Sequence, residues 1–415
     1  MGLTSIAKKV VKAVTTPRMR DSIKKGLFQG YTTAFFSESQ NGNKTLPFGV
    51  NLIGHVRGDF GLGESCRLVA GGLKASSVPF CVINVPLNGP ASENNLDWEA
   101  EEQKDYRYSV NLIHLNPDEL GKAIWRIKPS ALKKRYNIAY WLWELPEFPE
   151  TWTYTFDLFN EIWTPAEYIS QTIRRYTDLP VFTMPYGLQN PPTQPELDRA
   201  SFGLPEKDFL FMISYDGNSV SARKNPEGAI NAYRKAFPPG SEGVGLVIKA
   251  THETEEKLAE MRNSLAGCGK VYILTESYSK SAFHSLLSSV DAYVSLHRAE
   301  GFGLIMAEAM LLGTPVIATN WSANTEFMDE TVACMVDAEI VALEEDCPPY
   351  QKGWHWAQPD EDQAAMWMQR LYKDPIFREE LARRAKKHLI EDCSPFRAAK
   401  KMEKRLLELK NGQII

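Results

Sequence analysis

The sequence predicts an α/β protein made of two doubly wound domains that face each other across a cleft. Short apolar runs alternate with stretches of helical periodicity from residue 48 onward, which favours parallel sheets covered by helices. This alternation is interrupted at residues 189–203, a proline-rich and polar run that is typical of a connection between domains. A chain of 415 residues with 43% hydrophobic content can also bury two cores.

The first domain is predicted at residues 46–188. Its strands are expected within the apolar runs 49–56, 79–85, 109–115, 137–143, 161–165 and 181–185. A helix is expected at 64–75, directly after a glycine-rich turn that follows the first strand. Residues 91–105 are polar and acidic, and we expect a mobile loop there that could serve as a lid.

The second domain is predicted at residues 204–392. Its strands are expected within the runs 209–215, 243–250, 270–275, 291–297, 314–319 and 333–337. The helices between them are expected to begin near Pro226, Glu253, Ser279, Ile305 and Ala323. The last segment, 393–415, contains a charged amphipathic helix from Phe396 to Leu409.

Composition excludes several classes of protein. A net charge of −5 gives no overall reason to expect a nucleic-acid partner. The six cysteines lack the paired spacing of zinc sites, so we expect reduced thiols in a cytoplasmic protein and neither a metal nor a disulfide framework. The sequence contains no apolar run of membrane-spanning length and no secretory signal, so we expect a soluble body.

The N-terminal segment, 1–45, differs from the rest of the chain. At helical spacing one face carries apolar residues, the opposite face carries lysines, and Pro17 ends the pattern. The residues of these two faces are Leu3, Ile6, Val10 and Val14, and Lys8, Lys9 and Lys12. Such a helix, with the basic residues that follow it, suits an anionic membrane surface through residues 3–25, on the inner face of the cell membrane. Packing on its own domain and a cleaved presequence are the alternatives.

The most informative motif is HRAEGFGLIMAEAM in the second domain. Glu300 precedes the turn Gly301-Phe302-Gly303 between an apolar strand and a helix, and Glu308 lies one helical turn further on. In open α/β sheets ligands bind at such turns, where free N–H groups of the helix start can hold an anion. Carboxylates accept hydrogen bonds from hydroxyl groups, so the pair suits a ligand with several hydroxyls.

A second motif, SYDGNSVSARKNPEGAI, follows the first strand of the second domain. Arg223 and Lys224 stand immediately before the helix that Pro226 opens. Two cations beside a helix N-terminus favour a diphosphate site. A solvated pair of side chains at a turn is the alternative.

A third motif is the glycine-rich turn after the first strand, from Gly58 to Glu64. It departs from the dinucleotide fingerprint because Cys66 stands three residues after Gly63, which disfavours a nicotinamide or flavin dinucleotide. The turn still presents glycines at the start of a helix. An ordinary tight turn between strand and helix is the alternative.

Polar side chains at two strand ends of the first domain are further candidates. His114 and Asn116 end the run 109–115, where side chains point into a doubly wound cleft. Glu144 follows the run 137–143 among several tryptophans. A carboxylate beside indoles is a common way to hold a sugar, although a tryptophan-rich stretch is also typical of a core.

Asp360 and Asp362 match a D-x-D metal motif literally. They precede a predicted helix, where acidic residues favour the N-terminus, so we interpret them as capping residues rather than metal ligands.

The succession of a strand, Glu300, the Gly-Phe-Gly-Leu turn and a helix with Glu308 resembles the E-x7-E signature of retaining family 4 (group 1) glycosyltransferases of the GT-B fold. The resemblance implies two Rossmann-like domains, a last helix that crosses back to the first domain, and sugar transfer from a UDP- or GDP-linked hexose to a hydroxyl of a glycan or lipid-linked acceptor. It implies no metal and no further cofactor. The match covers residues 48–409 and is strongest from Phe209 to Phe327.

The resemblance also implies roles for the donor-site residues. Glu308 would bind the ribose hydroxyls, and Glu300 would orient the donor sugar together with the backbone of Gly301, Phe302, Gly303 and Leu304. Lys224, with Arg223, would stabilise the departing diphosphate. The family arginine stands directly after the strand, where this chain has Tyr215 and Asp216 at the donor site.

The first domain would contribute the remaining residues. Gly61, Leu62 and Gly63 would reach across the cleft to the sugar diphosphate. His114 would lie against the donor sugar, with Asn116 and Glu144 near the acceptor.

Three other functions remain compatible with the sequence. A sugar phosphorylase or synthase could share the fold, and a catalytically inactive module could act as a binding or assembly subunit. A dinucleotide-dependent oxidoreductase is disfavoured by the departure from the fingerprint.

Overall fold

The computed structural model describes most of the chain beyond residue 45. The described residues are 26, 30, 46–87, 93–123, 126, 127, 129–217, 219–265, 270–412 and 414. The basic amphipathic helix expected at residues 3–25 lies outside them. None of the helices in the described part of the chain is long and apolar enough to cross a membrane.

The first domain is a parallel sheet of six strands in the order β2-β1-β3-β4-β5-β6. The strands are β1 (Val50–Gly54), β2 (Phe80–Asn84), β3 (Val110–His114), β4 (Tyr136–Tyr140), β5 (Glu161–Thr164) and β6 (Val181–Thr183). Its helices are α3 (Gly61–Lys74), α4 (Pro117–Ala123), α5 (Pro129–Leu132), η1 (Glu150–Leu158) and α6 (Glu167–Arg174). Central strands such as β1, β3 and β4 are buried along their whole length, as expected for strands covered on both faces.

The second domain repeats this architecture with the order β12-β11-β10-β7-β8-β9. The strands are β7 (Phe209–Asp216), β8 (Val244–Thr251), β9 (Lys270–Leu274), β10 (Ala292–Ser295), β11 (Val316–Thr319) and β12 (Cys334–Val336). Its helices are η2 (Ala200–Phe202), α7 (Ser221–Lys224), α8 (Pro226–Ala236), α9 (Glu255–Ser264), α10 (Lys280–Ser289), α11 (Leu304–Leu312), η3 (Ala323–Glu326) and α12 (Glu361–Lys373). Each predicted apolar run coincides with one strand, so the doubly wound two-domain fold is confirmed.

The structure adds detail to the expectations at three places, and at one of them the expectation was wrong. The helix expected from Ala323 is the single 3₁₀ turn η3. An antiparallel pair that the sequence analysis missed, β13 (Ala338–Ala342) and β14 (His355–Pro359), extends from the second domain. The loop expected at 91–105 is described from residue 93 onward, and its residues 101–103 pair with the edge of the first sheet. There the backbone of Val82 in β2 donates to Glu101 and accepts from Gln103.

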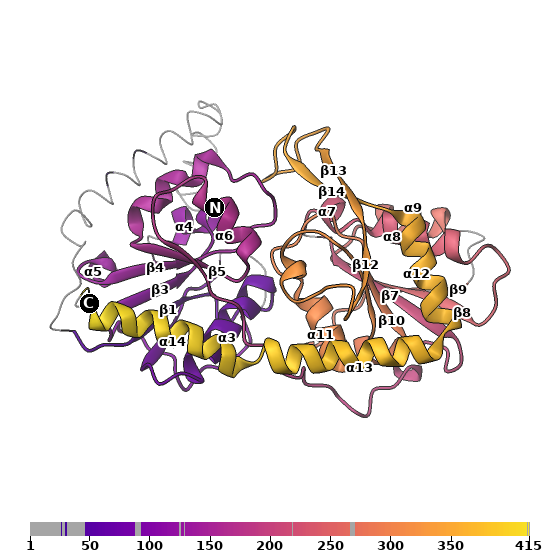
Figure 1. Cartoon of the computed structure of the whole chain (residues 1–415), viewed down its shortest axis with the longest axis horizontal. Coiled ribbons are helices and arrows are strands. Elements are labelled where there is room, and N and C mark those ends of the chain that lie inside the picture. The colour runs from indigo at the N-terminus through magenta and orange to yellow at the C-terminus, as the bar shows by residue number, and fades with distance from the viewer. Residues whose placement is uncertain are drawn as a thin grey trace, which may run out of the picture.

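Two consecutive helices end the described chain and connect the domains. α13 (Pro375–Asp392) runs along the second domain, and α14 (Pro395–Asn411) continues along the first, in yellow in Figure 1. α14 packs on α3 through Met402, Leu406 and Leu409, which are fully buried. Burial of each such side chain contributes about 2 kcal/mol of stability.

A buried ion pair holds α14 to the first sheet. The carboxylate of Glu161 in β5 is inaccessible to solvent and lies 2.6 Å from the Arg405 guanidinium. It also accepts hydrogen bonds from the Tyr136 hydroxyl at 3.0 Å and the Trp163 indole at 2.7 Å. Its acceptor capacity is therefore used by three partners from three elements.

Replacing Arg405 with methionine should destabilise the protein by about 3 kcal/mol, because it leaves the buried Glu161 charge without its cation. Thermal unfolding measures the effect, and adding Glu161→Gln to the same chain should recover most of the loss. Lys404→Met is the matched control on the exposed face of α14. An Arg405→Met protein that unfolds at the wild-type temperature would show that this pair does not fasten the helix.

Candidate functional site

A cavity of about 680 Å³ lies between the domains, at the carboxyl ends of β7, β8 and β10. A cavity of this size accommodates a nucleotide with an attached sugar. The first domain contributes Phe60, Gly61, Leu62, Asn116, Leu142 and Glu144 to its lining. The predicted site residues of the second domain that line it are Tyr215, Asp216, Arg223, Lys224, Glu300 and residues 301–304.

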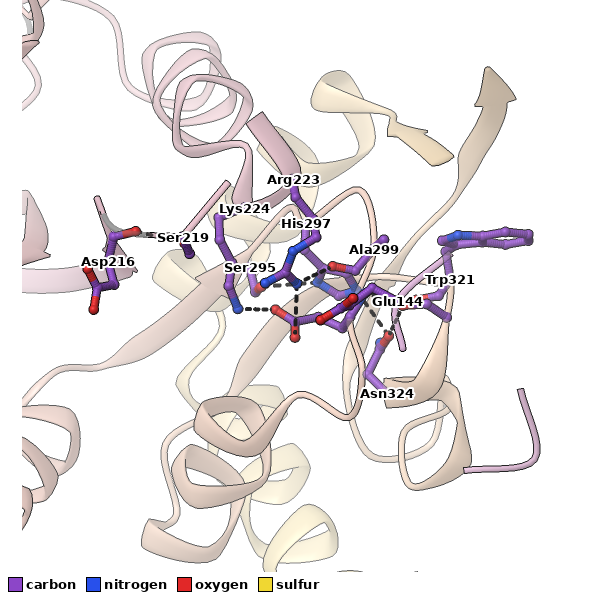
Figure 2. A network of polar contacts seen from close by, with 12 residues as sticks. Glu144, Asp216, Ser219, Arg223, Lys224, Ser295, His297, Ala299, Trp321 and Asn324 are labelled. Carbon is purple, nitrogen blue, oxygen red and sulfur yellow. Dashed lines mark hydrogen bonds and ion pairs between the residues drawn. The ribbon is translucent and has the colours of Figure 1, made fainter. Parts of the chain in front are cut away.

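A cluster of three charged side chains lies in this cavity (Figure 2). The Lys224 ammonium donates to the Glu300 carboxylate, and the Arg223 guanidinium lies 3.5 Å from its other oxygen. Arg223 also donates to the carbonyl oxygen of Ala299 at 2.8 Å. The carboxylate is almost entirely enclosed, with 9% of its side chain exposed, whereas 24% of the Lys224 side chain is exposed. Lys224 can therefore reach a ligand in the cavity.

The cluster fixes the charge of Glu300. Burial alone would raise the pKa of this carboxyl, but Lys224 and Arg223 outweigh it and lower the pKa to about 2. Burial lowers the pKa of the Lys224 ammonium, and the attraction of Glu300 opposes this only in part because Arg223 repels it. The two cations share one carboxylate. Glu300 is therefore held in its ionised form more firmly than Lys224 is held in its protonated form.

Backbone conformation positions Glu300 and the helix that follows it. The Glu300 N–H donates to the Ser322 hydroxyl at 2.9 Å, and Ser322 itself has a left-handed φ of 74°. Gly303 has a φ of 94°, which favours glycine, and Leu304 then begins α11. The N–H groups of the first turn of α11, which have no acceptor within the helix, therefore lie beside the charged cluster.

Hydrogen bonds connect the loop that contains Arg223 and Lys224 with the turn that contains Glu300. Asn225 adopts a left-handed φ of 51°, caps α8, and donates from its side chain to the Leu296 carbonyl at 2.9 Å. The Arg298 N–H donates to the Arg223 carbonyl at 2.7 Å. These bonds connect the turn after β7 with the turn after β10, so the two sequence motifs form one site.

The glycine turn of the first domain enters the site only in part. Gly61 and Leu62 line the cavity, but Gly63 does not. A side chain at Gly63 would come within 2.0 Å of the Gly58 carbonyl oxygen, so this glycine permits close packing inside the turn. Arg67, which the sequence analysis did not single out, donates to the carbonyls of Val56 and Gly58 and holds the turn in place.

The structure brings Asn116 and Glu144 to the cavity but not His114. The His114 ring is 1% exposed, stacks on Tyr140, and lies 2.6 Å from the Ser65 hydroxyl. Burial lowers the pKa of this imidazole to about 3. The ring belongs to the core of the first domain because it turns toward α3 rather than into the cavity.

Asn116 and Glu144 are each held by a neighbour. The Asn116 side-chain oxygen accepts from the Leu142 N–H at 3.0 Å, and the Glu144 carboxylate accepts from the Tyr350 hydroxyl at 3.1 Å. Tyr350 belongs to the segment between β13 and β14, so the second domain supports a candidate acceptor residue of the first. Trp141 and Trp143, which stand in the same stretch as Glu144, belong to the core.

Glu308 stands two residues after Met306, the last residue of α11 that lines the cavity. Its carboxylate lies 3.3 Å from the His284 ring and 3.8 Å from the Lys280 ammonium. Lys280 also contacts Glu64, which follows the glycine turn of the first domain. The carboxylate is therefore placed near the junction of the domains rather than in the lining of the cavity.

The acidic D-x-D motif caps a helix. Asp360 accepts from the N–H groups of Asp362 and Gln363 at the start of α12, and Asp362 pairs with Lys235 at 2.9 Å. Among the residues that the structure describes, no group of three or more His, Cys, Asp or Glu is placed to hold a metal ion.

Three further residues at the site were not predicted from the sequence. The buried His297 ring lies 3.0 Å from the Asn324 side-chain oxygen (Figure 2). It stands three residues before Glu300, inside the motif, and this position is the signal that could have indicated it. Lys249 and Tyr278 line the far side of the cavity, but Lys249 stands within a strand and Tyr278 within a polar turn.

Two Rossmann-like domains around a cavity, with a last helix that crosses back, define the GT-B architecture of glycosyltransferases. Residues 196–388 match the model of a family described as glycosyl transferases group 1. The predicted resemblance to group 1 glycosyltransferases is thereby confirmed for this part of the chain. A search of the curated proteins found no significant match.

Solved structures of the same fold include three that match most of this chain. HepE of Anabaena, in complex with UDP and glucose, has a TM-score of 0.64 at 13% identity, over 87% of this chain and 100% of its own. Sucrose-phosphate synthase from Thermosynechococcus elongatus has a TM-score of 0.63 at 14% identity, over 88% and 100%. A glycosyltransferase from Rickettsia africae has a TM-score of 0.60 at 12% identity, over 87% and 99%. The GT-B fold is confirmed.

Replacing Glu300 with glutamine should destabilise the protein at neutral pH by up to about 3 kcal/mol, because the buried Arg223 and the partly exposed Lys224 lose their counter-charge. The pKa of Glu300 falls from 4.5 to about 2 on folding, so this contribution is present above pH 4.5 and is lost as the pH falls toward 2. Thermal midpoints should therefore converge with acidification. Glu256→Gln, on the exposed face of α9, is the control, and a pH-independent gap between Glu300→Gln and wild type would contradict the prediction.

Proposed function

We propose that the chain is a retaining, metal-independent glycosyltransferase. It transfers a hexose from a UDP- or GDP-linked donor to a hydroxyl of a glycan or glycolipid acceptor, in the assembly of a polysaccharide or glycoconjugate. The observation that carries the proposal is the buried cluster of Glu300, Lys224 and Arg223 beside the N-terminus of α11. The UDP and glucose in the HepE structure support the choice of donor class.

The cluster offers a site for the donor diphosphate. Lys224 uses one of its three N–H groups on Glu300 and is partly exposed in the cavity, so the others can donate to phosphate oxygens. The N–H groups that open α11 would add a second set of donors. Gly61 and Leu62 approach from the opposite domain and would enclose the same group.

The transfer itself needs positioning and charge stabilisation more than a nucleophile. The bond from the sugar C1 to the diphosphate oxygen breaks while the acceptor oxygen bonds to C1 from the same face. The acceptor proton passes to the departing phosphate oxygen. Lys224 would stabilise the negative charge that develops there, and ionised Glu300 would accept hydrogen bonds from the donor-sugar hydroxyls.

The acceptor would enter from the first domain, past Asn116 and Glu144. Both side chains are fixed by neighbours and face the cavity, so they can orient a hydroxyl group toward C1. Residues 3–25 would hold the enzyme at an anionic membrane surface on its cytoplasmic side, which suits a lipid-linked acceptor.

The proposal is tested by turnover of UDP- and GDP-hexoses, measured as nucleotide release in the presence of EDTA. Lys224→Ala should lower kcat by about a hundredfold or more while the fold is retained, because the charge of the leaving group loses its cation. Lys235→Ala, which alters an exposed lysine on α8, should be unaffected. Activity that requires an added divalent metal would contradict the metal-independent mechanism, and full activity of Lys224→Ala would remove this lysine from the site.

A separate prediction concerns the ribose. Glu308 pairs with Lys280 and His284 beside the lining residues of α11, and we propose that its carboxylate accepts hydrogen bonds from the ribose hydroxyls of a bound nucleotide. Replacing it with alanine should therefore weaken UDP or GDP binding by about 1.5 to 3 kcal/mol. Isothermal titration calorimetry measures the affinity, and Glu330→Ala, an exposed carboxylate distant in sequence, is the control. Unchanged affinity in the Glu308 variant would assign this carboxylate to the contacts with Lys280 and His284 alone.

A further inference from the structure

A lysine ammonium without a hydrogen-bond acceptor lies buried in the wall of the cavity. Lys249 in β8 is 3% exposed, and its ammonium finds no acceptor among the described residues. The side chain nevertheless lines the cavity between the domains. Its ammonium lies 5.1 Å from the centre of the Tyr278 ring, on the turn that follows β9.

This arrangement is costly for the free protein. An ammonium group that is removed from water needs compensating hydrogen bonds, and one aromatic face supplies only part of them. Burial accordingly lowers the pKa of Lys249. A methionine would fill the same space without this cost, so the lysine is better explained by an acceptor that a ligand brings into the cavity.

The order of the strands indicates which part of the donor this acceptor belongs to. Neighbouring strands of the second sheet run in the order β10, β7, β8, β9. Glu300 follows β10, Lys224 follows β7, and Lys249 and Tyr278 belong to β8 and to the turn after β9. This step rests on the proposed function. A donor with its sugar at Glu300 and its diphosphate at Lys224 extends its base toward Lys249.

The surroundings of Lys249 suit a base rather than a second phosphate. The Tyr278 ring lies beside the Lys249 ammonium, and Phe283 is a second aromatic residue of the cavity lining. Ring faces stack on bases. The acidic residues Asp216 and Glu276 act electrostatically on Lys249, which disfavours a further anion beside it. A neutral group with a carbonyl oxygen can accept from the ammonium without this repulsion.

We propose that Lys249 reads the nucleobase of the donor by donating a hydrogen bond to an exocyclic carbonyl oxygen. Uracil and guanine present such an oxygen at the edge away from the sugar. Cytosine and adenine present an amino group at the corresponding position, which donates and therefore opposes the ammonium. Lys249 is thus a specificity-determining residue that selects uridine or guanosine donors over cytidine or adenosine donors.

The test compares nucleotides that differ at this edge. UDP and CDP share the ribose, the diphosphate and the 2-carbonyl group, and GDP and ADP form a second pair. Affinities are measured by isothermal titration calorimetry for the wild type, for Lys249→Met and for Lys257→Met, which alters an exposed lysine on α9. Inorganic pyrophosphate is titrated as a probe of the diphosphate site alone.

We expect the wild type to bind UDP or GDP about tenfold to a hundredfold more tightly than its amino partner. Lys249→Met should lose this preference, with little change for CDP, ADP or pyrophosphate, whereas Lys257→Met should retain it. The ligand-free Lys249→Met protein should unfold at or above the wild-type temperature, because a buried charge has been removed.

Other outcomes would overturn the inference. If the wild type bound both members of each nucleotide pair with equal affinity, that result alone would overturn the inference. Equal weakening of every nucleotide and of pyrophosphate by Lys249→Met would assign the lysine to the diphosphate, and unchanged affinities would leave it no role in binding. If no nucleotide bound the wild type, the proposed donor site itself would be wrong, which distinguishes that failure from the others.

Discussion

The site depends on a constraint of parallel sheets: the carboxyl ends of all their strands lie along the same edge. Two such sheets can build one cavity only if these edges face each other, and the chain secures this with apolar contacts. Phe302, on the turn before α11, packs against Tyr186 at the end of the first domain, with ring centres 4.7 Å apart. The turn that we propose to hold the donor is therefore also a contact between the domains. Phe302 therefore helps to fix both the position of this turn and the arrangement of the two domains.

The polar groups of the cavity are satisfied to different degrees. Glu300 is surrounded by two cations and by the Ser322 hydroxyl on its N–H, so it keeps one charge state and one position. Lys249 has no hydrogen-bond partner of its own among the described residues. Glu300 is therefore held in place without a ligand, while under our proposal the hydrogen bonding of Lys249 would be completed by the nucleobase. Catalytic sites benefit from the former, since nothing needs to move during the reaction, and recognition sites can use the latter.

Sequence periodicity predicted the two sheets well because strands buried on both faces are continuously apolar. Motifs predicted the Glu300 and Lys224 turns for a similar reason, since each motif lies within one turn of chain. His114 and Asn116 stand two residues apart, yet only Asn116 reaches the cavity, because the side to which a strand end turns depends on the neighbouring helix α3. The Glu144–Tyr350 contact joins residues 206 positions apart and has no local signal. Lys249 was counted as part of an apolar run.

The crossing helix has a consequence for how the protein is made. α14 leaves the ribosome after both domains, yet its buried face belongs to the first domain, which is synthesised before the second. Until Met402 and Leu406 arrive, the matching surface of α3 stays open to water and Glu161 lacks its cation. The first domain can form its sheet during translation but cannot close its outer layer. Folding of the first domain is therefore complete only after α14 has been synthesised. Chains truncated before α14 expose the apolar surface that this helix covers.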